Sequence, residues 1–295
     1  MIEVVEVLSG KDLNDFIRLP FNLYADDPFY VPQLTREVKK HFSDKNPFFD
    51  HAAVRYFLAK ENDTIVGRVA AIVNRRHIEF HHEKAGFFGF FESINKPEVA
   101  ITLINTVAGV LRKEGMEILR GPMNFSTNEE CGFLSEGFGQ PPILMTPYNH
   151  AYYNDLMEQC GLSKAKDLYA YILNTPEELP QKINRVAEIA LKSGIRVRPI
   201  DMKHFHRDMQ IFKVVYNSAW EKNWGFLPLT DEELLYLSNN LKPVVVPDMI
   251  VIAEKNSEPV GFLGLLPDFN FVLKHMNGSV NPLSILKALY YSKKI

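Results

Sequence analysis

The chain has 295 residues, of which 46% are apolar and 23% are charged, and its formal net charge is −3. This length and apolar content suffice for a full core, and a usual domain size of about 100–200 residues predicts two domains. The balanced charge excludes a broad positive surface, and the two cysteines, Cys131 and Cys160, lack the spacing of a zinc site or a disulfide framework. We therefore expect a cytoplasmic protein whose partners include no nucleic acid and no membrane.

Strands and helices alternate along the first half of the chain. Residues 2–7 alternate as a strand does, and a helix follows from Asp12. A polar stretch with several prolines comes next, and its aromatic residues, among them Tyr24 and Tyr30, predict a segment fixed to the surface. The pattern then predicts strands at residues 54–60, 65–73, 86–91 and 117–120, with a helix at 97–113.

The second half begins after a loop rich in glycine and proline. Its pattern predicts a helix at residues 150–159, a strand at 166–173 and a linker helix that begins at residues 175–178. We expect three parts in total, which are a first unit over residues 1–175, the linker helix over 176–193 and a partial second unit over 194–295.

Two segments of the chain match without a gap. Residues 57–67 (FLAKENDTIVG) align with residues 251–261 (VIAEKNSEPVG), so that Ala59 corresponds to Ala253 at an offset of 194. Any two hairpins with a polar turn look alike by chance, but the flanking segments also match, which favours an ancestral duplication. The second copy would then end where the first copy begins its central helix.

The order of strand, helix, antiparallel hairpin, strand, helix, strand, helix and strand resembles the fold of the GNAT acyl-CoA N-acyltransferases. The hairpin at residues 57–68 is typical of the second and third strands of that fold. The segments at residues 46–49, 86–92 and 120–129 are similar to those of bacterial proteins with tandem GNAT-like units. The resemblance implies an α/β (α+β) fold with tandem mixed sheets flanked by helices, the second unit being incomplete.

The resemblance also implies that the protein binds acetyl-CoA or another acyl-CoA. In GNAT enzymes the pantetheine lies beside the fourth strand, and the pyrophosphate binds backbone N–H groups at the start of the next helix. By position, the cofactor-binding residues would be Phe90, Phe91, Glu92, Ser93, Asn95 and Lys96. The usual Gln/Arg-x-x-Gly-x-Gly/Ala loop does not occur in the chain, so a plain helix cap at residues 93–96 is the alternative.

The acceptor site of this fold borders the end of the fifth strand. Residues 124–132 follow that strand and are dense in polar side chains. A carboxylate there, Glu129 or Glu130, is a candidate base for an amine, and a solvated turn is the alternative. Tyrosine on the next helix often serves as general acid in GNAT enzymes, so Tyr153 is a candidate, with core packing as its alternative.

A group of histidines follows the hairpin. His77 and His81 have the i, i+4 spacing of a metal-binding pair. The sequence contains no HExxH pattern and no third ligand, so we expect an exposed polar turn and no metal.

Two functions of different classes agree with these features. The polar residues 124–130 favour an acyl-CoA-dependent N-acyltransferase that moves an acetyl group to a small-molecule or peptide amine. The missing glycine loop favours the alternative, a non-catalytic ligand-binding or interaction module. The incomplete second sheet also predicts a cover for its open edge, by the first unit, by the tail at residues 282–291 or by a second copy in a homo-oligomer.

Overall fold

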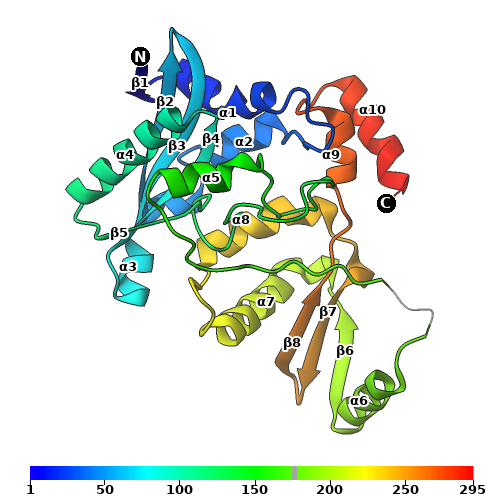
Figure 1. Ribbon diagram of the computed structural model, residues 1–295. Coiled ribbons are helices and arrows are strands. Elements are labelled where there is room, and N and C mark those ends of the chain that lie inside the picture. Colours follow the sequence, from blue (N-terminus) through cyan, green and yellow to red (C-terminus); the bar gives the residue numbers. More distant parts are fainter. Residues whose placement is uncertain (175–177, 295) are drawn as a thin grey trace. The chain divides into compact units, whose positions relative to one another are not determined.

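The computed structural model describes residues 1–174 and 178–294 (Figure 1). The chain forms two compact units. Unit 1 comprises Met1–Lys166 together with Asp268–Ile295, and unit 2 comprises Asp167–Pro267. Among the described residues, no helix has both the length and the apolar content needed to cross a membrane.

Unit 1 is built on a five-stranded mixed sheet with the order β1-β2-β3-β4-β5. The first four strands pair antiparallel, and β5 runs parallel to β4 after a crossover through helix α4 (Pro97–Lys113). Such a crossover is necessary because the chain must return to the same end of the sheet. The strands are β1 (Ile2–Glu6), β2 (Ala52–Glu61), β3 (Thr64–Asn74), β4 (Ala85–Ser93) and β5 (Ile118–Arg120).

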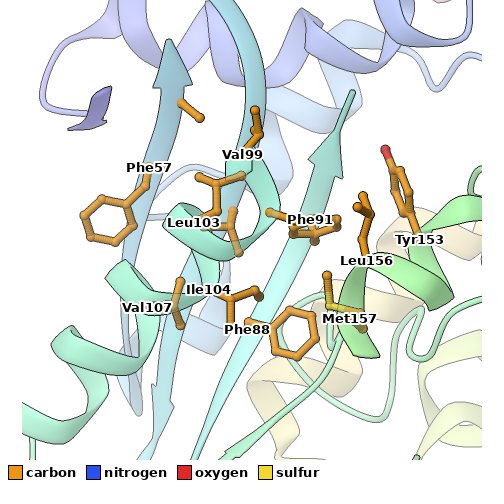
Figure 2. Packing of buried hydrophobic residues seen from close by; sticks show 14 of the residues in the cluster. Phe57, Phe88, Phe91, Val99, Leu103, Ile104, Val107, Tyr153, Leu156 and Met157 are labelled. Carbon is orange, nitrogen blue, oxygen red and sulfur yellow. The ribbon is translucent and has the colours of Figure 1, made fainter. Parts of the chain in front are cut away.

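Helices cover both faces of this sheet. Helix α4 and helix α5 (Tyr152–Gln159) pack on one face, where Figure 2 shows their apolar side chains against Phe88 and Phe91 of β4. Helix α1 (Gly10–Leu23) and helix α2 (Thr35–His41) contribute Phe16 and Val38 to the cluster on the other face. Two short helices, η1 (Pro47–Asp50) and α3 (Arg75–His81), flank the hairpin.

Unit 2 contains a hairpin of β7 (Ile250–Lys255) and β8 (Glu258–Gly264). Its strands pair in the same register as the β2-β3 hairpin of unit 1. Ala59 pairs with Gly67 in unit 1 and Ala253 with Gly261 in unit 2, and each register shifts directly after the alanine. Both turns use two residues of positive φ, as two-residue hairpin turns require. These are Asn62 (48°) and Asp63 (63°), and Asn256 (53°) and Ser257 (67°). The hairpins that the alignment pairs are therefore equivalent in backbone structure.

Unit 2 has a three-stranded antiparallel sheet with the order β6-β7-β8, where β6 is Ile195–Pro199. Its core contains Ile200, Phe205, Met209, Leu234 and Ile250. The carboxylate of Asp208 is fully buried and is held by Arg198, with Nη1 at 2.7 Å from Oδ2. The helices are α6 (Gln181–Lys192), η2 (Met202–His204), α7 (Phe205–Trp220), α8 (Asp231–Leu241), η3 (Lys242–Val244) and η4 (Pro247–Met249).

One of two expectations about the segment between the sheets differs from the structure. The strand expected at residues 166–173 is absent, and Tyr169 and Ile172 are exposed there. An apolar run forms a strand only where another strand offers hydrogen bonds to its backbone, and none pairs with this segment among the described residues. The linker helix is α6, and residues 175–177, its expected beginning, lie outside the described residues.

The tail of the chain packs with unit 1, whereas the sequence predicted it in a partial second unit over residues 194–295. It forms α9 (Asn270–Met276), α10 (Pro282–Tyr291) and η5 (Ser292–Lys294). Thr35 donates its N–H and its hydroxyl to the carbonyl of Gly278, each at 3.0 Å. Asn270 Nδ2 donates to the carbonyl of Pro142 at 2.8 Å, and Lys274 Nζ donates to that of Pro28. These hydrogen bonds between distant segments hold the tail against unit 1. The order of the elements along the chain does not predict this position of the tail.

Candidate active site

Glu92, near the end of β4, is a carboxylate inside unit 1 and is only 9% exposed. Its Oε2 accepts hydrogen bonds from the hydroxyls of Tyr153, at 2.6 Å, and Tyr24, at 3.0 Å. Arg68 pairs with Glu92 across β3 and β4, and its Nη2 lies 3.5 Å from Oε1. The same guanidinium donates to the carbonyl of Phe16 at 2.6 Å, which fixes it beside α1.

The surroundings of Glu92 change its protonation. Burial raises the pKa of Glu92, while the charge of Arg68 and the hydrogen bonds from Tyr153 and Tyr24 act in the opposite direction. Burial, followed by the negative charge of Glu92, also raises the pKa of Tyr24 and of Tyr153. Both hydroxyls therefore keep their protons and donate to the carboxylate. A perturbed carboxyl group held by several polar side chains marks a candidate functional site.

Four aromatic rings stack in a column next to this carboxylate. The order is Tyr30, Tyr24, His150 and Tyr152, with ring centroids 4.6, 4.3 and 5.0 Å apart and interplanar angles of 10°, 12° and 13°. Stacked rings at such distances stabilise one another. Tyr24 follows the last turn of α1 and Tyr152 begins α5, so the column joins two helices that are distant in sequence.

An open surface pocket of about 460 Å³, called the cavity below, lies beside the aromatic column, and His150 forms part of its wall. Asp27 in that wall accepts hydrogen bonds from the Tyr148 hydroxyl at 2.7 Å and from the N–H of Phe29 at 2.8 Å. The described residues that line it include two carboxylates and several apolar side chains but no lysine or arginine. They include Leu23, Asp26, Asp27, Phe29, Phe138, Tyr148 and His150. This size and lining suit a small ligand or the head of a larger one.

His150 has a defined tautomer. Its Nε2 lies 3.2 Å from the carbonyl oxygen of Leu23, which only accepts hydrogen bonds, so the neutral ring carries its proton on Nε2. The lone pair is then on Nδ1, for which no hydrogen-bond partner is found within the described part of the chain. Because His150 lines the cavity and a neutral imidazole can accept a proton, this residue is a candidate base.

The two carboxylates predicted beyond β5 have different surroundings. Glu129 pairs with His41, with Oε2 at 2.8 Å from Nε2. Glu130 is partly buried, and burial raises its pKa to about 7, with the negative charge of Glu129 acting in the same direction. Glu130 also interacts electrostatically with Glu92 and with Tyr30. The structure thus brings Glu130 near the Glu92 cluster and ties Glu129 to α2.

The predicted residues on β4 are bonded within unit 1. Phe90 has a φ of 51°, and its N–H donates to Asn124 Oδ1 at 2.8 Å. The N–H of Ser93 donates to the Tyr153 hydroxyl at 3.0 Å, and the carbonyl of Ser93 accepts from the Tyr152 hydroxyl at 2.8 Å. Tyr153, predicted as a general acid, is fully buried, and its hydroxyl points away from the apolar cluster in Figure 2.

The remaining predicted residues, Phe91, Asn95 and Lys96, have three different surroundings. Phe91 packs in the core, and Asn95 is exposed. Lys96 forms an ion pair with Glu61, with Nζ at 2.6 Å from Oε1, so its charge is neutralised. The acyl-CoA-binding role that the resemblance implies for these residues stays a prediction.

The sequence did not single out Tyr24, Arg68 or His150 as site residues. The aromatic residues of the proline-containing stretch were a signal for Tyr24 and Tyr30, although only of a fixed segment. The ring of His150 is oriented by its hydrogen bond to the carbonyl of Leu23, which lies 127 positions earlier in the chain. The local sequence around His150 does not indicate this contact.

The sequence predicted an exposed turn at the histidine group, but the structure has a helix there with His77 buried. Asn74 caps α3 by accepting from the N–H of His77 at 3.2 Å, and the ring of His77, 3% exposed, packs on Phe87. Its Nε2 lies 3.0 Å from Glu83 Oε1, and the same oxygen is 2.5 Å from Arg120 Nη1. Among the described residues, no group of three or more His, Cys, Asp or Glu side chains could hold a metal ion.

The fold class follows from the first sheet. Four antiparallel strands, a helical crossover and a parallel fifth strand that separates from the fourth are the arrangement of the GNAT acyltransferase fold. A tandem GNAT protein from the clavulanic acid biosynthesis pathway aligns over 98% of this chain and 94% of its own, with a TM-score of 0.46 and 10% identity. An aminoglycoside acetyltransferase from an uncultured soil metagenomic sample aligns over 59% of this chain and 97% of its own, with a TM-score of 0.36 and 13% identity.

Two relatives define the family more narrowly. Protein YghO of Escherichia coli (strain K12) is 34% identical over 286 residues, which are 97% of this chain and 73% of that protein. The bacterial ceramide synthase of Caulobacter vibrioides (strain NA1000 / CB15N) is 32% identical over 294 residues, 99% of this chain and 77% of that protein. No family model matches the chain. The chain belongs to the family of these two proteins.

Proposed function

We propose that this chain takes part in forming an amide, by transfer of an acyl group from a thioester to the amine of a long-chain amino alcohol. The Caulobacter relative is a ceramide synthase, and a ceramide is the amide of a fatty acid with such an amino alcohol. That similarity covers 99% of this chain and so includes all elements of the candidate site. A fatty acyl group thus replaces the acetyl group of the sequence-based hypothesis.

The observation that carries the proposal is the continuous contact from the cavity to the buried carboxylate. His150 lines the cavity and stacks on Tyr24, and the hydroxyl of Tyr24 donates to Glu92. The carboxylates of Asp26 and Asp27 in the wall attract an ammonium group, since opposite charges favour each other's charged form. The apolar side chains of the same wall suit the first part of an alkyl chain.

The reaction requires a base because an amine is an ammonium ion near neutral pH and has no free lone pair. One proton passes to Nδ1 of His150. The freed lone pair attacks the carbonyl carbon of the thioester and forms the C–N bond, and the C–S bond breaks. The sulfur leaves with the bonding electrons and takes up the second proton of the amine.

A transfer assay with hexadecanoyl-CoA and a long-chain amino alcohol tests the proposal, with the amide measured by mass spectrometry. His150→Asn should lower the rate by about 100-fold or more, because the proton acceptor is lost. His82→Asn is the control, because His82 is exposed and has a left-handed backbone (φ 53°) that asparagine tolerates. Equal rates for the two variants would contradict the role of His150.

A binding module that holds the amine without transferring an acyl group is the second candidate function. The engaged backbone of β4 favours it, because no donor site is open there. In that case the long-chain amine should bind, and Asp27→Asn should weaken its binding, while no donor yields an amide. Calorimetry of the amine alongside the transfer assay separates the two functions.

A further inference from the structure

The GNAT resemblance implies that pantetheine lies between β4 and β5 and pairs with the backbone of β4. In unit 1 the N–H of Phe90 and both backbone polar groups of Ser93 are bonded to side chains of the unit itself. We infer that unit 1 holds no acyl-CoA along β4, because Asn124, Tyr152 and Tyr153 occupy the place of the pantetheine.

The gap begins after a short parallel ladder. Pairing between β4 and β5 ends at Phe87 and Arg120, and the N–H of Met123 then donates to the carbonyl of Phe88 at 2.8 Å. Gly89 lets the two segments approach, because a Cβ atom there would collide with the carbonyl oxygen of Met123. A ligand could therefore pair with β4 only over residues 90–93.

Asn124 closes the first part of the gap. Its Oδ1 accepts from the N–H of Phe90 at 2.8 Å, as described above. The side chain is not free to swing away, since the N–H of Asn124 donates to the carbonyl of Glu130 at 3.0 Å and Met123 forms a β-bridge with Cys131. The side-chain amide of Asn124 also bonds to the carboxyl group of Glu130. A pantetheine amide would have to displace the side chain of Asn124, which these contacts hold in position.

Tyr152 and Tyr153 close the second part. The Tyr153 hydroxyl accepts from the N–H of Ser93, and the Tyr152 hydroxyl donates to the carbonyl of Ser93. Both backbone polar groups of Ser93 therefore have partners. Displacing Tyr153 would expose a fully buried side chain and would also break its hydrogen bond to Glu92. Buried polar groups that lose their partners destabilise a fold, so the two tyrosines resist displacement.

The start of α4 is equally poor as a pyrophosphate site. Pro97 has no N–H, and the N–H groups of Val99 and Ala100 bond to the carbonyl of Lys96. The side chain of Lys96 is paired with Glu61, and Glu98 adds a negative charge in the first turn. An anion at a helix start is favoured by free N–H groups and a positive charge, whereas here two of the first N–H groups are bonded and the lysine is paired.

Amide hydrogen exchange of the intact chain, with and without CoA and hexadecanoyl-CoA, tests the inference at the level of single segments. Exchange over residues 90–93 should change by less than about twofold with either ligand, because the side chains already protect these groups. In the absence of ligand, Asn124→Leu should accelerate exchange at Phe90 by about tenfold or more, since the acceptor is gone. Asn124→Asp keeps an acceptor oxygen and serves as the matched control.

The outcomes are distinct. Slowing of exchange over residues 90–93 by about tenfold or more with hexadecanoyl-CoA would overturn the inference, because it means that the ligand pairs with β4. Slowing confined to other segments, or to none, supports it. If Asn124→Leu does not fold, the wild-type comparison alone decides. The readout is exchange rather than turnover, so the result is independent of whether the chain transfers an acyl group.

Discussion

Three carboxyl groups of unit 1 titrate differently because their neighbours differ. Hydrogen bonds from Arg120, and after them from His77, lower the pKa of Glu83 to about 2. Burial raises the pKa of Glu130 to about 7, and it also raises the pKa of Glu92 despite the nearby Arg68. A bonded cation favours the charged form, whereas desolvation penalises it. Unit 1 therefore contains groups that change its stability with pH in opposite directions.

Glu83→Gln should lower the free energy of unfolding at pH 7 by about 1–2 kcal/mol, because it removes the charge that Arg120 and His77 bind. The folded pKa of Glu83 lies below the unfolded value, so its contribution is present above about pH 4.5 and is lost as pH falls towards about 2. Urea unfolding of the wild type and the variant from pH 7 to pH 2 measures this loss, and the two free energies of unfolding should become equal at the low end. Glu117→Gln, which removes an exposed pair with Lys84, should have a much smaller effect, and an equal loss in both variants would contradict the prediction.

Glu130→Gln should raise the free energy of unfolding at pH 8 by about 1–3 kcal/mol, because it removes a desolvated charge beside Glu129. The folded pKa is above the unfolded value, so the folded state takes up a proton first as pH falls from about 8 to about 5. The stability of the wild type should therefore rise over that interval, while the variant gains less. Thermal unfolding across this range gives the comparison, and a variant less stable than the wild type at pH 8 would refute it.

At the scale of elements, the end of β4 controls how unit 1 is assembled. The strand packs tightly against the segment after β5 and then turns through a residue of positive φ, Phe90. There the N–H of Phe90 is bonded to Asn124 and the polar groups of Ser93 to the start of α5, while Glu92 and Ser93 stay paired with β3 on the other edge. Glu92 is brought to the interior by this change of direction, so the site depends on the geometry of one strand.

Gly89→Ala should destabilise the protein by about 2–4 kcal/mol, because the new methyl group would collide with the backbone of Met123, which cannot rotate away. Gly109→Ala on α4 is the matched control, since a Cβ atom there meets nothing within 4 Å. It should stabilise the protein by about 0.5–1 kcal/mol through helix propensity. Urea denaturation measures both variants, and similar midpoints would show that β4 and Met123 do not approach as described.

At the scale of the whole molecule, the chain leaves unit 1 for unit 2 and then returns. The tail supplies buried Val272 and Met276 to unit 1 and bonds to the loops at Pro28 and Pro142. Pro28 also lines the cavity, so residues from the end of the chain brace a wall of the candidate site. The cavity therefore depends on segments from both ends of the sequence.

Proteolytic cleavage within residues 167–267 should leave the tail bound to unit 1, because buried side chains and hydrogen bonds hold it there. Size-exclusion chromatography of the cleaved protein, followed by mass spectrometry, should find residues 268–294 in the same peak as residues 1–166. Met276→Asp should release the tail by placing a charge in an apolar contact, whereas Lys287→Asp on an exposed position should not. Release of the wild-type tail would contradict the assignment to unit 1.

The sequence by itself determined the features that depend on near neighbours. The hairpins at Ala59 and Ala253, their two-residue turns and the apolar face of α4 follow from local conformational preference and from the helical period. The order of these elements also sufficed to predict the GNAT-like fold of unit 1. The polar residues after β5 are likewise a group visible in the local sequence, and the role predicted for Glu130 among them stays a prediction.

Only the tertiary structure decided which residues meet and how they ionise. Tyr24, Glu92 and His150 come from α1, β4 and the loop before α5, and no short-range pattern connects them. The failed expectations have the same origin, because the strand at residues 166–173 required a pairing neighbour and His77 became buried through a cap and a packed ring. The pKa of each carboxyl group depends on desolvation and on nearby charges in space, and neither is determined until the chain is folded.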